Sequence, residues 1–89
     1  MSGQKDGLIE FPCRFPLKVM GGSHPDFAGE VLTAVQAHAP DTREEHVSLR
    51  PSRDGNYMSA TVTVYAENQE QLDNIYRALT AHPMVKVVF

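Results

Sequence analysis

Hydrophobic and polar residues alternate along short stretches of this chain, and apolar residues recur at helical spacing between them. Alternation is typical of a strand with one buried face, and it occurs in residues 15–20, 46–50 and 57–65, while Val85, Val87 and Phe89 indicate a closing strand. Apolar residues three and four positions apart indicate an amphipathic helix, and they occur between residues 27–39 and 72–79. The pattern therefore predicts four strands and two helices in the order β-α-β-β-α-β.

Local signals in the first half of the chain set the expected ends of the first strand and helix. Gly21-Gly22 interrupts the alternation and should end the strand. Ser23 and Asp26, three residues apart, form a capping-box pattern at the start of a helix. Pro40 should stop that helix, because proline cannot continue the helical hydrogen bonds.

Similar signals occur in the second half. Pro51 should end the second strand, and Asp54-Gly55 is a favoured dipeptide for the turn of a β-hairpin. Asn68 should cap the second helix, with Gln71 at the capping-box position. His82-Pro83 should end that helix before the last strand.

This order of elements is the split βαβ, or ferredoxin-like, arrangement of an α+β domain. We expect a four-stranded antiparallel sheet in the order 4-1-3-2, with right-handed crossovers and both helices on one face. The chain has 89 residues, which is enough for one domain. We expect a flexible polar tail at residues 1–8 and a single domain at residues 9–89.

Composition and charge narrow the class of protein. Eight basic and eleven acidic residues give a net charge of −3, which does not favour general binding to nucleic acid. Cys13 is the only cysteine, so an intrachain disulfide or a cysteine-based zinc site is excluded. The start of the chain has no signal-peptide pattern, and no run of about 18 apolar residues predicts a membrane span. We therefore expect a cytoplasmic protein without a metal or cofactor.

One end of the predicted sheet gathers residues that suit an anion. The loop after the first strand, the central hairpin and the turn before the last strand should meet there. A glycine pair before a helix N-terminus offers free N–H groups and the positive end of the helix dipole, which favour a carboxylate or phosphate. The expected ligand-binding residues are Gly21, Gly22, Ser23, His24, Arg53 and Asn56. The same residues also suit a plain strand-to-helix turn and a plain hairpin, so both interpretations stay open.

The sheet face without helices is the second candidate surface. The positions assigned to it are mostly hydroxylated or basic: Arg14, Lys18, His46, Ser48, Arg50, Tyr57, Ser59, Thr61, Thr63, Tyr65, Lys86 and Val88. The acidic residues fall mainly in the helices and connections, so this face should be mildly basic. Such a face suits an acidic partner or a second copy of the chain, with Lys18, Arg50, Tyr57, Thr61 and Lys86 as the interaction residues. A merely solvated strand face is the other interpretation.

RNA recognition and catalysis are not expected. RNA-recognition modules share this topology and stack bases on strand aromatics, but here Ser59 and Thr61 occupy the positions next to Tyr57. The four histidines show no metal-ligand spacing such as HExxH. Cys13 is isolated, and we expect it to act as a small apolar residue.

Five short segments stand in order along the chain: "EFP", "FPLKVMG", "VQAHAP", "PSRDGNY" and "IYRAL". Together they resemble the YbeD-like family of small bacterial proteins, and the resemblance covers nearly all of the chain beyond the tail. The residues that carry it are Glu10, Phe11, Pro12, Lys18, Val19, Met20, Gly21, His38, Pro40, Pro51, Ser52, Gly55, Asn56 and Tyr57. The family is similar to ACT-like regulatory domains, which bind small effectors near the glycine turn after the first strand. The resemblance also implies an accessory role beside lipoate attachment.

Two functional hypotheses follow. The first is a non-enzymatic, regulatory ACT-like module that binds a small anionic metabolite at the glycine end of the sheet. The alternative is a protein-interaction module that uses the open sheet face or the edge strands, as a homodimer or with another protein, in a role accessory to lipoate metabolism.

Overall fold

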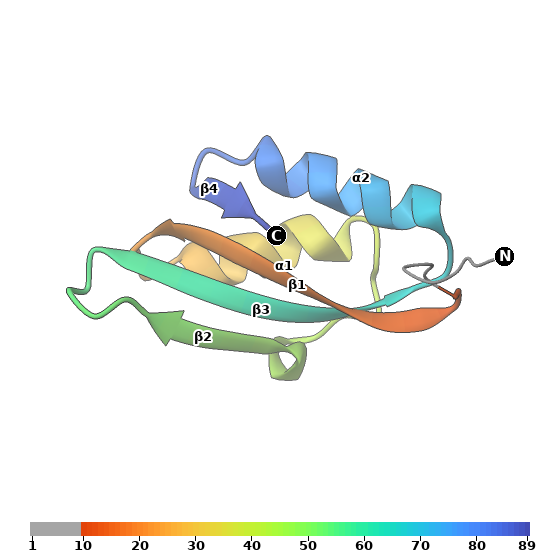
Figure 1. The fold of residues 1–89 in the computed structure, drawn as a ribbon, viewed down its shortest axis with the longest axis horizontal. Helices are drawn as coiled ribbons and strands as arrows, with labels where there is room; N and C mark the ends of the chain where they lie inside the picture. Colours follow the sequence, from red (N-terminus) through yellow and green to blue (C-terminus); the bar gives the residue numbers. More distant parts are fainter. Residues whose placement is uncertain (1–9) are drawn as a thin grey trace, which may run out of the picture.

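The computed structural model describes residues 10–89, which form a four-stranded sheet covered by two helices (Figure 1). The predicted tail at residues 1–8 lies outside the described residues. The elements follow the expected order with one additional 3-10 turn: β1 (Cys13–Gly22), α1 (Phe27–Gln36), η1 (Glu44–His46), β2 (Val47–Pro51), β3 (Tyr57–Ala66), α2 (Gln69–Thr80) and β4 (Val85–Val88).

The sheet topology confirms the predicted ferredoxin-like arrangement. The strand order is β2-β3-β1-β4, which is the predicted 4-1-3-2 order counted from the other edge. β1 and β3 pair antiparallel along their whole length, from Cys13 opposite Ala66 to Gly22 opposite Tyr57. Both helices lie on the same side of the sheet in Figure 1, so no helix of residues 10–89 covers the other side. We call that other side the open face.

The hydrophobic core lies between the helices and the inner face of the sheet. The fully buried strand residues follow the predicted alternation in β1 and β3, and the helical residues follow the predicted stripes: Leu17, Val19, Ala60, Val62, Val64, Ala66, Phe27, Val31, Val35, Ile75 and Leu79. Burial of each large apolar side chain contributes about 1.5–3 kcal/mol. A shift of one residue in a strand would turn this whole set toward water, so the core fixes the strand register.

The start of α2 matches its sequence signal. The Asn68 side-chain oxygen accepts a hydrogen bond from the Gln71 backbone N–H at 2.8 Å. The Gln71 side chain accepts from the Glu67 N–H at 2.7 Å and donates to the His38 carbonyl at 2.9 Å. The cap therefore also ties the start of α2 to the chain that follows α1.

The predicted start of α1 is wrong. The helix begins at Phe27 with Asp26 as the N-cap residue, and the Asp26 side chain makes no capping bond. Ser23 lies three residues before this N-cap, beside the hairpin, where its N–H donates to the Asn56 carbonyl at 3.1 Å. His24 takes over part of the role, since its Nδ1 accepts the Asp26 N–H at 3.0 Å.

The end of α1 also differs from the prediction. The helix ends at Gln36, and a turn with a hydrogen bond from the Ala39 N–H to the Val35 carbonyl leads to Pro40. The ring of a proline disfavours the helical conformation in the residue before it, so the regular helix ends before Pro40.

A β-bulge changes which residues of β4 face outward. The register between β1 and β4 shifts at Met20, so that Val88 lies opposite Val19 and Val87 lies opposite Met20. Because Val19 points into the core, Val88 faces inward, and its predicted place on the open face is wrong. Val87 faces outward instead and is 46% exposed. Lys86 is the exposed residue at the bulge.

Candidate functional site

The glycine pair at the end of β1 belongs to the strand. Both glycines pair with β3 and β1 ends at Gly22, so the strand ends at the pair as predicted, although the pair lies in the strand and does not form the turn that follows. A Cβ on Gly21 would overlap the Met84 carbonyl oxygen and come within 2.5 Å of Phe27 Cε1, whereas a Cβ on Gly22 would meet nothing within 4 Å. Close packing of α1 and the chain before β4 therefore accounts for Gly21.

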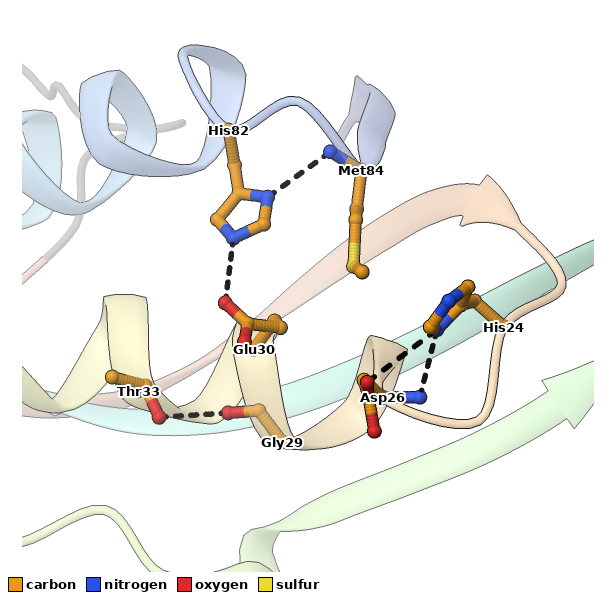
Figure 2. A network of polar contacts seen from close by, with 7 residues as sticks. All are labelled: His24, Asp26, Gly29, Glu30, Thr33, His82 and Met84. Carbon is orange, nitrogen blue, oxygen red and sulfur yellow. Dashed lines mark hydrogen bonds and ion pairs between the residues drawn. The ribbon is translucent and has the colours of Figure 1, made fainter.

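The backbone groups beside this pair are already hydrogen-bonded within the chain. The Ser23 N–H donates to the Asn56 carbonyl, and the Phe27 N–H donates to the His24 carbonyl at 3.0 Å. The Asp26 N–H donates to the His24 ring, as Figure 2 shows. The structure thus brings Ser23 and Asn56 together as predicted, but these bonds occupy several donors that an anion would need.

The hairpin tip is also satisfied by its own residues. The Asp54 carboxylate accepts the Asn56 N–H at 3.1 Å and the Ser52 hydroxyl at 2.8 Å. The Ser52 oxygen in turn accepts the Tyr57 N–H at 3.0 Å. The hydrogen bond from the Asn56 backbone, followed by that from Ser52, lowers the pKa of Asp54 below its ordinary value of 3.8. Arg53 is exposed in the turn, and its predicted contact with a ligand stays a prediction.

A histidine joins the two helices at this end of the molecule (Figure 2). His82 Nδ1 accepts the Met84 N–H at 3.1 Å, which assigns the ring proton to Nε2 in the neutral imidazole. Nε2 then donates to Glu30 on α1, at 3.2 Å from Oε1. His24 and His82 share this end as expected, but each is engaged in its own bonds, which fasten the loops to the helices.

The open face separates positive from negative charge along the chain. The four strands contain four of the eight basic residues, Arg14, Lys18, Arg50 and Lys86, and none of the eleven acidic residues. The acids lie in the helices, turns and N-terminal segment. The sheet therefore carries basic side chains and no acidic ones, although the net charge of the protein is −3.

Two of these cations frame a shallow cavity of about 250 Å³ near the middle of the open face. We call it the basic basin, and it is lined by Lys18, Ser48, Arg50, Ser59 and Thr61. Lys18, Thr61 and Ser48 lie opposite one another across β1, β3 and β2, and Arg50 lies opposite Ser59 in the next row. Two positive groups and the hydroxyls of Ser48 and Thr61 thus converge on one surface that suits a carboxylate or phosphate group, while the Ser59 hydroxyl donates to the Arg50 carbonyl at 3.3 Å.

Large side chains surround the basic basin. Tyr57 lines a neighbouring cavity with Arg50 and is 45% exposed. Phe89 exchanges two backbone hydrogen bonds of 2.8 Å with Lys18, is 55% exposed, and holds its ring 5.8 Å from the Lys18 ammonium. The sequence did not reveal that Val87 and Phe89 face outward, because the residues on both sides of the bulge are apolar and the bulge leaves no mark in their pattern.

Four of the five predicted interaction residues lie at this basin. Lys18, Arg50 and Thr61 line it, and Tyr57 lies beside it. Lys86 is exposed at the bulge.

Other kinds of site are not supported by the described residues. Within residues 10–89, no group of three or more His, Cys, Asp or Glu side chains is placed to hold a metal ion. Cys13 is half-buried and unpaired at the start of β1. None of the helices described has the length and apolar composition needed to cross a membrane.

Comparison with known proteins gives family relatives and a structural neighbour. Residues 6–89 match the family described as "Protein of unknown function (DUF493)". The UPF0250 protein NMC1112 of Neisseria meningitidis is 66% identical over 84 residues, covering 94% of this chain and 92% of the relative. A UPF0250 protein of Paraburkholderia phytofirmans is 54% identical over 88 residues and 99% of each chain. The solution structure of protein HP0495 from H. pylori superposes with a TM-score of 0.67 at 18% identity, covering all of this chain and 93% of the neighbour, which supports the fold.

Proposed function

The chain belongs to the DUF493 family, and we propose that it is a non-catalytic interaction module that binds an acidic segment of a partner protein on its open face. The observation that carries this proposal is the segregation of charge. Lys18 and Arg50 converge on the basic basin, and no acidic residue lies in any of the four strands.

Electrostatic attraction would guide such a partner to the face. The basin lies on a protein of net negative charge, so an acidic segment is attracted locally and repelled elsewhere. Complementary charges of this kind raise association rates and make them sensitive to salt. We therefore expect binding to weaken as ionic strength rises.

The large side chains beside the basin supply the apolar part of the interface. Tyr57, Val87 and Phe89 are about half exposed on or beside the face, and Met20 lies between them in β1. Aromatic residues that become buried at the centre of an interface often carry much of its binding energy. A partner segment with a carboxylate flanked by apolar residues fits both features.

The edge of β2 is less suited to adding a strand. The Ser52 N–H bonds to β3, so by the alternation of an antiparallel ladder Val47, Leu49 and Pro51 direct their backbone groups away from the sheet. The Val47 N–H is already bonded to the Glu44 carbonyl, and Pro51 has no N–H. Leu49 thus supplies the one available donor on β2. Although its side chain is 45% exposed, this edge offers little to a pairing strand.

The metabolite hypothesis is separable from this proposal. A small anion at the glycine end would contact Ser23, His24 and Arg53, so Arg53→Ala would weaken its binding and leave the open face unchanged. Stabilisation of the wild-type protein in a thermal-shift screen of lipoate and nucleotides, lost in Arg53→Ala, is the result expected for that hypothesis. A regulatory role of the protein would also require that the wild type is stabilised by such a ligand.

The proposal is tested by affinity purification with three forms of the full chain. In the double variant Lys18→Glu, Arg50→Glu, an acidic partner captured by the wild type should be lost. The control Arg77→Glu makes a charge reversal on α2, away from the open face, and should retain the partner. Circular dichroism would verify that each form is folded. Capture of the same proteins by all three forms, or loss in the control alone, would contradict the proposal.

A further inference from the structure

A second cavity on the open face has a different chemistry from the basic basin. It lies where β1 begins, and its volume is also about 250 Å³. Its lining contains groups of both charges: Arg14, Asp41, Thr42, His46, Thr63 and Tyr65. We call it the mixed-charge cavity. Arg14 and Asp41 both line it, yet no ion pair within 4.0 Å joins these two side chains.

The cationic side of the cavity is held in place by its neighbours. Arg14 lies opposite Tyr65 in the sheet, and its guanidinium carbon lies 5.8 Å from the centre of the Tyr65 ring. Such a cation–π contact restricts the guanidinium while leaving N–H groups free to donate. The hydroxyl groups of Thr63 and Tyr65 offer further donors on the same strand.

The histidine of the cavity has a defined proton. His46 Nδ1 accepts the Arg43 N–H at 2.9 Å, so the neutral ring carries its proton on Nε2. The hydrogen bond from the Arg43 N–H restricts the orientation of the His46 ring. The ring of His46, which lines the cavity, can therefore offer its Nε2–H as a hydrogen-bond donor.

The acidic side of the cavity is anchored by a buried residue. Thr42 is only 3% exposed, and both of its backbone groups are bonded: its N–H donates to the Ala39 carbonyl at 3.0 Å, and its carbonyl accepts from the Gln36 side chain at 2.8 Å. These bonds fix the position of the adjacent Asp41. The carboxylate is thus attached to a segment that is hydrogen-bonded to α1, and it lines the same cavity as Arg14 of β1.

We propose that the mixed-charge cavity binds a small zwitterion with one carboxylate and one ammonium group. The carboxylate would accept hydrogen bonds from Arg14 and the neighbouring hydroxyl and imidazole donors, and the ammonium would pair with Asp41. A ligand with only a carboxylate would place a like charge near Asp41, and a ligand with only an ammonium group would place a like charge near Arg14. Drug-sized ligands occupy pockets of about 300–1,000 Å³, so this smaller cavity suits a molecule the size of an amino acid. This inference does not depend on the proposed protein partner.

The test is a binding titration followed by the backbone amide resonances of the full chain. The probes are unbranched amino acids with increasing charge separation (glycine, β-alanine and γ-aminobutyrate), together with the N-acetyl and amide derivative of each. We expect at least one free zwitterion to shift resonances at residues 14, 41, 46 and 63, and both of its derivatives to bind about tenfold more weakly or worse.

Two variants and one control complete the test. Asp41→Asn removes the negative charge with little change of shape, Arg14→Gln replaces the guanidinium by a shorter neutral amide, and each should weaken binding of the zwitterion by about tenfold. Arg77→Gln, on α2, should leave it unchanged. Absence of saturable shifts with every probe would overturn the inference, as would equal binding of the N-acetyl derivative or unchanged affinity in both cavity variants.

Discussion

Replacing Gly21 with alanine tests whether the glycine is needed for packing. The added methyl group would overlap the Met84 carbonyl oxygen and lie 2.5 Å from Phe27 Cε1. Phe27 is fully buried, and a backbone carbonyl cannot move away as a surface side chain can. Overpacking of a core typically costs about 1–3 kcal/mol. We expect the upper part of this range, reduced by the roughly 0.4–1 kcal/mol that alanine contributes by restricting the unfolded chain.

The expected net loss in the free energy of unfolding is therefore about 2 kcal/mol. For a domain of this size, each 1 kcal/mol lowers the melting temperature by roughly 4–8 °C, so the fall should be about 8–16 °C. Gly22→Ala is a matched control, because its Cβ meets nothing within 4 Å and its backbone does not have a positive φ. That variant should be as stable as the wild type or slightly more so. Equal unfolding curves for the two variants in urea would refute the packing argument.

Three further predictions concern local hydrogen bonds. Asn68→Ala removes the cap of α2 and should lower stability by about 1 kcal/mol in urea unfolding, whereas Asn68→Asp keeps the acceptor and should lose much less. His82→Ala removes the bond to Glu30 and also the acceptor of the Met84 N–H, and it should cost about 1–3 kcal/mol, while Glu30→Gln keeps an acceptor and should cost little; a loss in Glu30→Gln as large as that in His82→Ala would contradict the assigned Nε2 proton. Because the pKa of Asp54 is lowered on folding, its ionised form stabilises the hairpin above pH 3.8, and this stabilisation is lost as the pH falls through the lowered value. The stability difference between the wild type and Asp54→Asn should therefore shrink in acid, and a constant difference would contradict the hydrogen bonds assigned to that carboxylate.

The elements with a uniform pattern could be predicted from the sequence. β3 alternates without interruption between buried and outward residues, so its register and both of its faces follow from the pattern alone. The capping pair Asn68 and Gln71 likewise makes its bonds within a few residues, which is why the start of α2 matched. Because the strands could be located from their pattern, the absence of acidic residues from them was also readable from the sequence.

The errors arise where contacts between distant segments decide the local structure. Ser23 fits a capping pattern, but a bond to the hairpin holds it in the extended chain. A glycine can be required for a turn or for close packing against a neighbouring side chain. The sequence at Gly21 does not distinguish these two roles, and the structure shows that close packing against Phe27 applies. In β4 the residues on both sides of the bulge are apolar, so alternation could not show that Val87 faces outward and Val88 inward.

The candidate sites follow the same division. The basic basin joins residues whose outward direction was readable strand by strand, and the structure adds that they converge. The mixed-charge cavity depends on the position of Asp41 in a connection, which no periodic pattern describes.

Site-specific photocrosslinking in the native cell would detect a partner bound at the open face. A benzophenone-bearing phenylalanine would replace Tyr57, beside the basic basin, and in a separate form Arg77, on the helical layer. We predict a discrete adduct with an acidic protein from position 57, lost when Lys18→Glu and Arg50→Glu are added, and no such adduct from position 77. An adduct from position 77 alone, or one from position 57 that persists after both charge reversals, would be inconsistent with an acidic partner bound at the basic basin.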